Sequence, residues 1–326
     1  MKLAFIYYDL SSFVRSDQEI LSRHFQVESV RYRGFRDIPK IVTAIWKSDA
    51  VYSWFASGHS FLAVLSARLL GKKSVVVAGG YDVAYVPEIS YGQYTLGWHK
   101  RMYADYVLNN ADLILAVSEF TKSELMARSR PRKTEVVYNC IDTDLFKPKG
   151  EKEDLVMTVA SGLKNVIELK GLDTFVKAAE YLPDVRFLVV GMTTEDKKEL
   201  GQCISSDNVE LGGRATQPEL IGCYQRAKVY CQLSYRESFG VALAEAMACG
   251  CVPVVTDRGA LPEVVGTAGY IVPYKDPIST ANAIERALSS GKEHVARERI
   301  RSAFRKELRE ARIIGSLKAI VEASGK

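Results

Sequence analysis

The sequence has no run of about 18 consecutive apolar residues, the length that a membrane-spanning helix needs. It also lacks low-complexity tracts and repeats of fixed period. Residues 1–8 are apolar, but they include no small-residue cleavage site and continue directly into Asp9. We therefore interpret them as a first buried strand and not as a signal peptide, and we expect a cytoplasmic globular protein.

The six cysteines form no C-x-x-C pair, and no histidines stand near them at the spacing of metal ligands. This pattern excludes the common zinc sites and a disulfide-rich scaffold, so we expect free thiols and no metal site. Cys249 and Cys251 are interpreted as small buried residues near a helix end. No G-x-G-x-x-G follows any predicted strand, which argues against a dinucleotide-dependent dehydrogenase.

Charge is unevenly distributed along the 326 residues. Residues 1–150 contain 20 Lys and Arg against 15 Asp and Glu, whereas the remaining residues contain 24 of each. Basic clusters occur at Arg31, Arg33 and Arg36 and again at residues 128–133. Such clusters attract anionic membranes or phosphorylated substrates, or they are ordinary solvated surface. Nucleic acid is not an expected partner, because the sequence shows no stacking platform and no known binding module.

Short β-branched runs alternate with amphipathic stretches along the whole chain. Strands are predicted at residues 3–8, 50–53, 74–78, 113–117, 136–138, 155–160, 185–190, 229–233 and 252–256. Helices are predicted at 14–24, 59–70, 93–109, 119–128, 172–182, 217–226 and 239–248, with Ser118 as an N-cap. Alternating strands and helices indicate parallel sheets covered on both faces, which is an α/β fold.

The length fits two domains, and a polar stretch at residues 144–154 separates the two sets of strands. We predict an N-terminal Rossmann-like domain over residues 1–148 and a C-terminal one over 149–308. A helical tail over 309–326 is expected to pack back on the N-terminal domain. In doubly wound sheets ligands bind at the carboxyl ends of the strands, so we expect the site in an interdomain cleft.

The strongest chemical signal lies at residues 234–250, where a predicted strand, a turn and a helix follow one another. The free amides at the start of such a helix hold phosphate, and Gly240 lets a ligand approach the backbone closely. Glu237 and Glu245 stand slightly more than two helical turns apart and therefore share a face. Two carboxylates there suit paired hydroxyls, as on a sugar and a ribose. The alternative is that Glu237 is an N-cap acid and Glu245 an exposed helix residue.

Residues 237–245 resemble the E-x-F-G-x-x-x-x-E signature of the retaining GT-B glycosyltransferases of family 4, the group 1 glycosyltransferases. The stretches at 111–118, 139–148, 250–255 and 259–265 resemble further motifs of this family in the expected order. The resemblance implies a GT-B fold, with two Rossmann-like domains and a cleft between them. It extends from about residue 105 to 272.

The resemblance also implies roles for residues of the donor side. Glu237 and Lys170 are catalytic candidates, the first on hydroxyls of the donor sugar and the second on the diphosphate. The expected donor-binding residues are Lys164, Lys170, Glu237, Ser238, Phe239, Gly240, Glu245, Gly213 and Arg214. The family often has Arg where this chain has Lys164, which keeps the charge but loses the guanidinium fork.

The N-terminal half departs from the family pattern at two places. Residues 9–13 contain no glycine, so we expect Ser11 and Ser12 to serve on the acceptor side. Tyr81 stands where the family often has His, within a tight turn that includes Gly80 and Asp82. We therefore place Gly80, Tyr81 and His59 on the acceptor side, with the alternative that His59 is a surface or cap residue. Asp82 is counted with the catalytic candidates.

The resemblance thus implies a metal-independent, retaining hexosyltransferase that takes its sugar from a UDP- or GDP-type donor and needs no cofactor. The expected acceptor is a glycan or a lipid-linked molecule, in glycolipid, polysaccharide or glycoconjugate synthesis. The basic N-terminal half suggests peripheral association with the inner face of the membrane. The alternatives are an epimerase-like enzyme and a non-catalytic relative that binds a nucleotide sugar.

Overall fold

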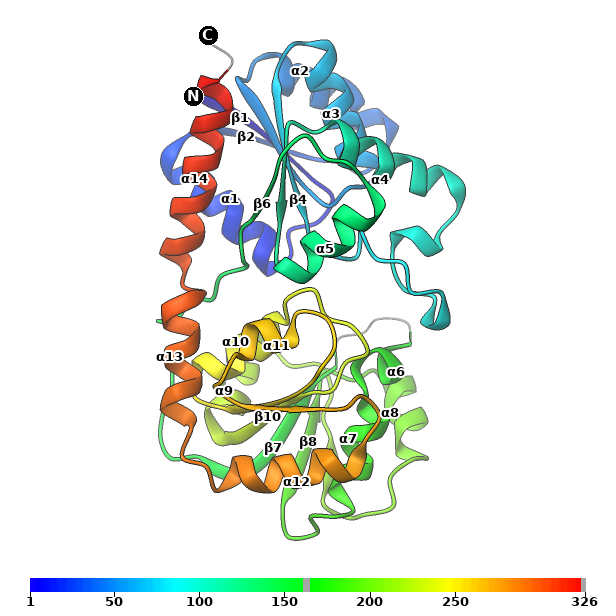
Figure 1. Cartoon of the computed structure of the whole chain (residues 1–326), viewed down its shortest axis with the longest axis vertical. Coiled ribbons are helices and arrows are strands. Elements are labelled where there is room, and N and C mark those ends of the chain that lie inside the picture. The colour runs from blue at the N-terminus through cyan, green and yellow to red at the C-terminus, as the bar shows by residue number, and fades with distance from the viewer. Residues whose placement is uncertain (161–164, 324–326) are drawn as a thin grey trace. The chain divides into compact units, whose positions relative to one another are not determined.

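The computed structural model describes residues 1–160 and 165–323. The chain forms two compact units, one made of Met1–Cys140 with Glu307–Lys326 and the other of Ile141–Lys306. Each unit has a six-stranded sheet in which all paired strands are parallel, and helices cover both faces (Figure 1). The sequence correctly predicts two doubly wound α/β units.

The change of unit lies at Cys140 and Ile141, eight residues before the predicted boundary at 148. The amide of Ile141 donates a hydrogen bond to the carbonyl of Phe304 at 2.8 Å, and the Phe146 ring lies 6.4 Å from that of Tyr224. Both contacts are made within the second unit. Residues 141–148 therefore belong to it, although their polar composition reads as a linker.

The first unit has the strand order β2-β1-β3-β4-β5-β6. Its strands are β1 (Lys2–Tyr7), β2 (Gln26–Arg31), β3 (Ala50–Trp54), β4 (Lys73–Ala78), β5 (Leu113–Ala116) and β6 (Thr134–Val136). Its helices are α1 (Ser12–His24), α2 (Ile38–Trp46), α3 (Gly58–Leu69), α4 (Trp98–Asn110), α5 (Glu119–Arg128) and α14 (Lys306–Glu322), and its short 3-10 turns are Phe35–Asp37, Pro87–Ile89 and Gln93–Thr95.

Alternate residues of the central strands supply the two cores of this unit. Leu3, Phe5 and Tyr52 point to one face, where they pack with α1 and with Ile313 and Leu317 of α14. The opposite face packs against α2, α3, α4 and α5. The last helix of the chain, red in Figure 1, is therefore a structural part of the first unit.

One buried ion pair links α14 to α1. The Arg309 guanidinium donates to both oxygens of Asp17, at 2.6 and 2.8 Å, and neither side chain is more than 2% exposed. Tyr52 and Trp54 also donate to the Asp17 carboxylate, at 2.7 and 2.9 Å. The Asp17 carboxylate thus accepts from both α14 and β3, and these bonds orient the tail on the sheet.

The second unit has the order β12-β11-β10-β7-β8-β9. Its strands are β7 (Glu153–Val159), β8 (Arg186–Val190), β9 (Val209–Leu211), β10 (Ala227–Gln232), β11 (Val252–Thr256) and β12 (Tyr270–Val272). Its helices are α6 (Val166–Lys170), α7 (Leu172–Ala179), α8 (Thr194–Gly201), α9 (Gln217–Arg226), α10 (Val241–Ala248), α11 (Leu261–Val265), α12 (Pro277–Leu288) and α13 (Glu293–Ala303).

Two sets of helices pack on this sheet. Phe175 of α7 and Ile284 of α12 share a core with Phe187, Val229 and Cys231 of the strands. Tyr230, whose neighbours in the strand point into that core, instead meets Tyr224 of α9, with ring centroids 5.9 Å apart. Helices α10, α11 and α13 also contact β10 or β11. Both faces are covered, which explains why the strands are apolar throughout.

Two predicted helices have different limits in the structure. The helix predicted over 93–109 begins only at Trp98, because residues 93–95 form a 3-10 turn and the next two residues, Leu96 and Gly97, leave the helical region with ψ of 174° and 156°. The helical tail begins at Lys306, three residues before its predicted start at 309, and a break separates it from α13, which ends at Ala303. Phe304 at this break is buried against Phe239 with ring centroids 5.3 Å apart.

Candidate functional site

The strand order of the second unit predicts a ligand site between β7 and β10. From β7 the chain proceeds outward to β8 and β9, whereas β10, β11 and β12 lie on the other side of β7. This reversal is a topological switch point, and the carboxyl ends of the two strands that flank it form the usual ligand crevice of a doubly wound sheet. The segment after β7 carries Lys170, and the segment after β10 carries Glu237.

The structure brings these two predicted catalytic residues together. The Lys170 ammonium donates to a carboxylate oxygen of Glu237, and each side chain is 16% exposed. Gly171 follows Lys170 with a φ of +64°, and a Cβ there would stand 2.1 Å from the carbonyl oxygen of Leu233. A glycine is thus required for the α6–α7 corner to approach the end of β10, and this approach sets the position of Lys170.

Polar side chains of β10 and the residues after it support the Glu237 carboxylate. Gln232 Nε2 and Ser234 Oγ donate to Oε1 of Glu237 at 3.2 and 3.4 Å. Tyr230 donates in turn to the amide oxygen of Gln232 at 3.0 Å. Sequence reasoning missed Gln232 and Ser234, although polar residues at the end of a buried strand were a signal for them. The carboxylate is held before any ligand binds.

The backbone of Glu237 is fixed by the turn after β11. The Ala260 amide donates to the Glu237 carbonyl at 2.9 Å. Gly259 has a φ of +63°, and a Cβ at this position would stand 2.3 Å from that carbonyl oxygen and 2.7 Å from the Glu237 nitrogen. Because no side chain fits between the two segments, Gly259 sets how closely they approach.

The residues directly before α10 include one buried aromatic side chain, Phe239, and polar groups on either side of it. Phe239 is 2% exposed and packs on Phe304, so its side chain belongs to the core. Gly240 is the N-cap with a φ of +86°, and Ser238 Oγ accepts from Arg236 at 3.0 Å. The first amides of a helix have no acceptor within the helix. The backbone here therefore suits an anion.

Glu245 lies in the middle of α10 and is partly buried. Burial raises the pKa of its carboxyl to about 7. The hydrogen bond from the Tyr224 hydroxyl, at 3.4 Å, acts in the opposite direction and lowers this pKa. Burial, and then the charges of Glu237 and Glu245, also raise the pKa of the Tyr230 hydroxyl. Glu245 is therefore not an ordinary exposed helix residue.

Gly213 and Arg214 lie farther from this pair in the sheet order. Gly213 follows β9 at the edge of the sheet, where its carbonyl accepts from the Gly191 amide at 2.9 Å. Arg214 beside it is exposed. Lys164 lies outside the described residues. The roles of these three residues stay predictions.

The predicted acceptor-side residues all lie at the carboxyl edge of the first sheet. Ser11 and Ser12 follow β1, where Ser11 is the N-cap of α1 without a side-chain capping bond and Ser12 is exposed. Gly80 and Tyr81 follow β4, with a φ of +108° at Gly80. Tyr81 is 38% exposed and meets the Tyr91 ring edge-on at 5.2 Å. Partial burial raises the pKa of its hydroxyl.

Asp82 is buried, in contrast to the Lys170–Glu237 pair. Its two oxygens accept from the amides of Ala56 and Gly80, at 2.7 and 2.8 Å. These bonds join the segment after β3 to the segment after β4. The contacts describe a carboxylate that shapes this edge of the sheet, and a catalytic role for Asp82 stays a prediction.

His59 is buried, so it is not a surface histidine. Its Nε2 donates to the Trp54 carbonyl at 2.7 Å, and Nδ1 lies 2.8 Å from the Ser57 hydroxyl. Burial lowers the pKa of the imidazole to about 4, so the ring is neutral at physiological pH. With both nitrogens bonded inside the unit, His59 positions the turn after β3, and direct contact with an acceptor stays a prediction.

Among residues 1–160 and 165–323, no group of three or more His, Cys, Asp or Glu side chains is arranged to hold a metal ion. Within the same residues, no helix is both long and apolar enough to cross a membrane. The six cysteines are free thiols, as predicted, and Cys249 and Cys251 are buried.

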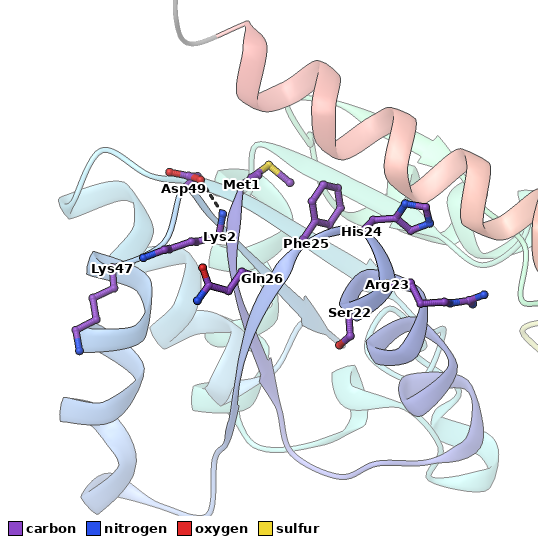
Figure 2. Close-up of a pocket in the computed structure, with 9 residues that line it drawn as sticks. All are labelled: Met1, Lys2, Ser22, Arg23, His24, Phe25, Gln26, Lys47 and Asp49. Carbon is purple, nitrogen blue, oxygen red and sulfur yellow. Dashed lines mark hydrogen bonds between the residues drawn. The ribbon is translucent and has the colours of Figure 1, made fainter.

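A hollow of about 800 Å³ lies in the first unit, and its lining residues, drawn in Figure 2, include no predicted site residue. It is lined by residues at the amino ends of β1 and β2, opposite the edge that carries the predicted acceptor side. Two of its lining side chains, Arg23 and His24, contact Glu310 of α14 at 3.2 and 2.6 Å, so α14 holds this side of the hollow.

Comparisons with known proteins agree with this geometry. A model of "Glycosyl transferases group 1" matches residues 143–307, and a model of "Glycosyltransferase Family 4" matches residues 15–145. Among curated relatives, a phosphatidylinositol N-acetylglucosaminyltransferase chain of Arabidopsis thaliana is 24% identical over 77% of this chain. A D-inositol 3-phosphate glycosyltransferase of Mycobacterium sp. (strain JLS) is 30% identical over 57%. The matches span 62% and 46% of those two proteins, respectively, so this chain covers less than two thirds of either.

Solved structures extend the likeness to almost the entire chain. A sucrose-phosphate synthase from Thermosynechococcus elongatus superposes with a TM-score of 0.80 at 19% identity, over 99% of this chain and 100% of that one. HepE of Anabaena, in complex with UDP and glucose, gives 0.76 at 18% identity, over 98% and 99%. These likenesses establish the GT-B fold. One of the two family models covers half of the chain, and the chain belongs to the group 1 glycosyl transferases.

Proposed function

We propose that this protein is a retaining glycosyltransferase that moves a sugar from a nucleoside diphosphate to an acceptor hydroxyl. The observation that carries the proposal is the Lys170–Glu237 ion pair at the switch point of the second sheet. It joins a cation and a hydrogen-bond acceptor where an α/β sheet binds its ligand. Transfer of a sugar from a diphosphate needs both groups, one for the leaving group and one for the sugar hydroxyls.

In the proposed reaction, the bond between the anomeric carbon and the diphosphate oxygen breaks as the bond to the acceptor oxygen forms on the same face. The acceptor proton leaves with the diphosphate. Lys170 neutralises the charge that develops on the diphosphate, so its ammonium must turn from Glu237 toward a phosphate oxygen when the donor binds. Glu237 remains held by Gln232 and Ser234 and accepts hydrogen bonds from sugar hydroxyls.

The other donor contacts follow from α10. Its first amides and the positive end of its dipole bind a phosphate. Glu245, which also accepts from the Tyr224 hydroxyl at 3.4 Å, accepts from the ribose hydroxyls. The site thus has positive charge without a metal ion, and we propose a metal-independent reaction with a UDP- or GDP-type donor. A solved relative in fold, HepE, was crystallised with UDP, which favours UDP.

Nucleotide-sugar binding is the first test of the proposal. We expect UDP-sugars or GDP-sugars to raise the melting temperature of the purified protein, because a ligand that binds only the native state stabilises it. Saturating UDP-glucose, UDP-N-acetylglucosamine and GDP-mannose that all leave the melting temperature unchanged would overturn it. Incubating the bound donor alone then separates a transferase from an epimerase, which would isomerise the sugar without an acceptor.

For the acceptor we propose a lipid-linked or glycan hydroxyl that the first unit binds at a membrane surface. Residues 98–102 at the start of α4 include Trp98, which is 76% exposed, together with the exposed Lys100 and Arg101. An exposed indole beside cations is typical of surfaces that lie at the interface of anionic lipid. Phe35, 83% exposed between Arg33 and Arg36, repeats the pattern elsewhere in the unit.

A further inference from the structure

Beside the Lys170–Glu237 pair, three neighbouring strands of the second sheet end in an aromatic cluster around one arginine. Tyr235 follows β10, Arg258 follows β11 and Tyr274 follows β12. These strands are adjacent in the sheet, so the residues that follow them meet at its carboxyl edge. We define Tyr235, Arg258 and Tyr274 as the arginine cage. None of these three residues belongs to the donor contacts proposed for Lys170, Glu237, Glu245 and α10.

The two tyrosine rings hold the guanidinium from two directions. Arg258 Cζ lies 5.3 Å from the centroid of the Tyr235 ring and 5.2 Å from that of Tyr274. The rings themselves meet edge-on at 5.2 Å. Together the two cation–π contacts restrict a side chain that is otherwise flexible.

The hydrogen-bonding edge of Arg258 remains open. Its side chain is 46% exposed, and its one ion pair joins Nε to the Asp257 carboxylate at 3.8 Å, beyond hydrogen-bond distance. In the part of the chain that the structure describes, no acceptor lies within hydrogen-bond distance of the guanidinium. A planar fork of donors held in place but unused matches the two oxygens of a carboxylate or a phosphate.

The cage rests on the same backbone segments that carry the catalytic candidates. The Tyr235 amide donates to the Leu169 carbonyl at 2.9 Å, next to Lys170. The Tyr274 hydroxyl donates to the Glu168 carbonyl at 3.2 Å. On the other side, Arg258 precedes Gly259, which approaches the Glu237 backbone too closely for any side chain. The backbone segments that hold Lys170 and Glu237 therefore also hold the members of the arginine cage.

We propose that Arg258 is a specificity-determining residue that binds an oxyanion of the donor, either a diphosphate oxygen or a carboxylate on the sugar. The inference rests on the proposed function, because it presumes that the donor occupies the Lys170–Glu237 site. Tyr235 and Tyr274 act through the arginine, which they position. The positive charge of the guanidinium favours anionic groups over neutral ones at this edge of the site. Because the side chain is already restricted, it loses little entropy on binding them.

The test is calorimetric titration of UDP, GDP, UDP-glucose and UDP-glucuronate into the wild type, Arg258→Gln and Arg258→Lys. Loss of a charge-assisted hydrogen bond is expected to weaken binding about 10- to 100-fold in Arg258→Gln. Weakening of all nucleotides that bind identifies the diphosphate as the partner, whereas weakening of UDP-glucuronate alone identifies the sugar carboxylate. Arg258→Lys is expected to recover only part of the affinity, because it keeps the charge but loses the fork.

Arg286→Gln is the matched control, because Arg286 also lies over a tyrosine ring, that of Tyr270 at 4.8 Å, but belongs to α12. Its affinities should equal those of the wild type. If Arg258→Gln binds every probe within twofold of the wild type, the inference is wrong and the proposed function stands. If the wild type binds none of the four probes, both are wrong. Equal melting temperatures of the two variants exclude unfolding as the cause.

Discussion

Lys170 and Glu237 form a partly buried ion pair across 67 positions of the chain. Lys170 ends a five-residue helix after β7, and Glu237 lies in the turn after β10. Neither residue is close to the other in sequence, and neither belongs to a long regular element that would position it alone. The pair exists because two glycines, Gly171 and Gly259, let three loop segments approach at the carboxyl edge of the sheet.

The first prediction concerns this pair. Lys170→Met and Glu237→Gln should each lower sugar transfer by about 100- to 1,000-fold, because each removes charge or hydrogen bonding that the transition state needs. The melting temperature should change little, since both side chains retain some contact with water. Initial rates with the donor found by the binding screen provide the measurement. The control is Lys228→Met, which removes a cation paired with Asp154 in the same unit. Full activity in either site variant would exclude the assigned roles.

The second prediction concerns pH and Glu245. Its pKa is raised from a usual 4.5 to about 7, so below pH 7 the carboxyl is mostly neutral and accepts more weakly from two ribose hydroxyls, because one of its oxygens then carries a proton. Donor affinity should therefore fall roughly tenfold between about pH 8 and pH 6, as calorimetric titration would measure. Glu245→Gln should bind more weakly at about pH 8 and show no such slope. A slope that persists in this variant would assign the titration to another group.

The same shift has an opposite consequence for stability. Because burial favours the neutral carboxyl, the native state binds the proton more tightly than the unfolded chain does. Glu245 thus stabilises the protein below pH 4.5, and this contribution is lost as the pH rises toward 7. Urea denaturation at about pH 5 and pH 8 should show a larger gain in stability at the higher pH for Glu245→Gln.

The third prediction tests the close approach at Gly259. Gly259→Ala places a methyl group 2.3 Å from the Glu237 carbonyl at a φ of +63°, so the Glu237 turn must move. We expect transfer to fall at least tenfold and the melting temperature to drop, as thermal unfolding and rate measurements would show. Gly222→Ala in α9 is the control, since nothing lies within 4 Å of its Cβ and a helical alanine should stabilise by about 0.5 to 1 kcal/mol. Unchanged activity of Gly259→Ala would mean that the turn adapts.

The fourth prediction concerns the tail. Arg309→Met leaves the Asp17 carboxylate buried without its cation and should lower the free energy of unfolding by about 3 to 5 kcal/mol. Chemical denaturation monitored by tryptophan fluorescence suits the measurement, because Trp54 donates to the same carboxylate. Lys318→Met, an exposed change in the same helix, should have almost no effect. Equal stability of the two variants would show that the apolar contacts of α14 hold it on the first sheet without the ion pair.

The fifth prediction concerns membrane association. Trp98→Ser should weaken sedimentation of the protein with vesicles of phosphatidylglycerol and phosphatidylcholine, and high salt should weaken binding of the wild type. Vesicles of phosphatidylcholine alone should bind little. Tyr181→Ser, which removes an exposed aromatic residue from the second unit, serves as the control. If the wild type fails to bind anionic vesicles even at low salt, the membrane proposal is wrong.

Local patterns predicted several elements with their full limits. Helix α5 runs from Glu119 to Arg128 as predicted, because Ser118 caps it with a bond to the Thr121 amide at 3.0 Å. Strand β11 and helix α9 also have their predicted ends. By contrast, β2 was not predicted, since this edge strand is largely exposed and carries charged residues. Its pairing with β1 over Lys2–Tyr7, not its own composition, makes it a strand.

The two doubly wound units and the donor-side motif could be predicted from local patterns, because periodic burial and helix caps act over a few neighbouring residues. Which charges meet depends on the tertiary structure. It joined Lys170 to Glu237, placed Gln232 and Ser234 behind the carboxylate, and buried His59 with both nitrogens bonded. It also assigned α14 to the first unit through Arg309 and Asp17. These contacts depend on strand order and on glycine-permitted approaches between distant segments, which no local pattern encodes.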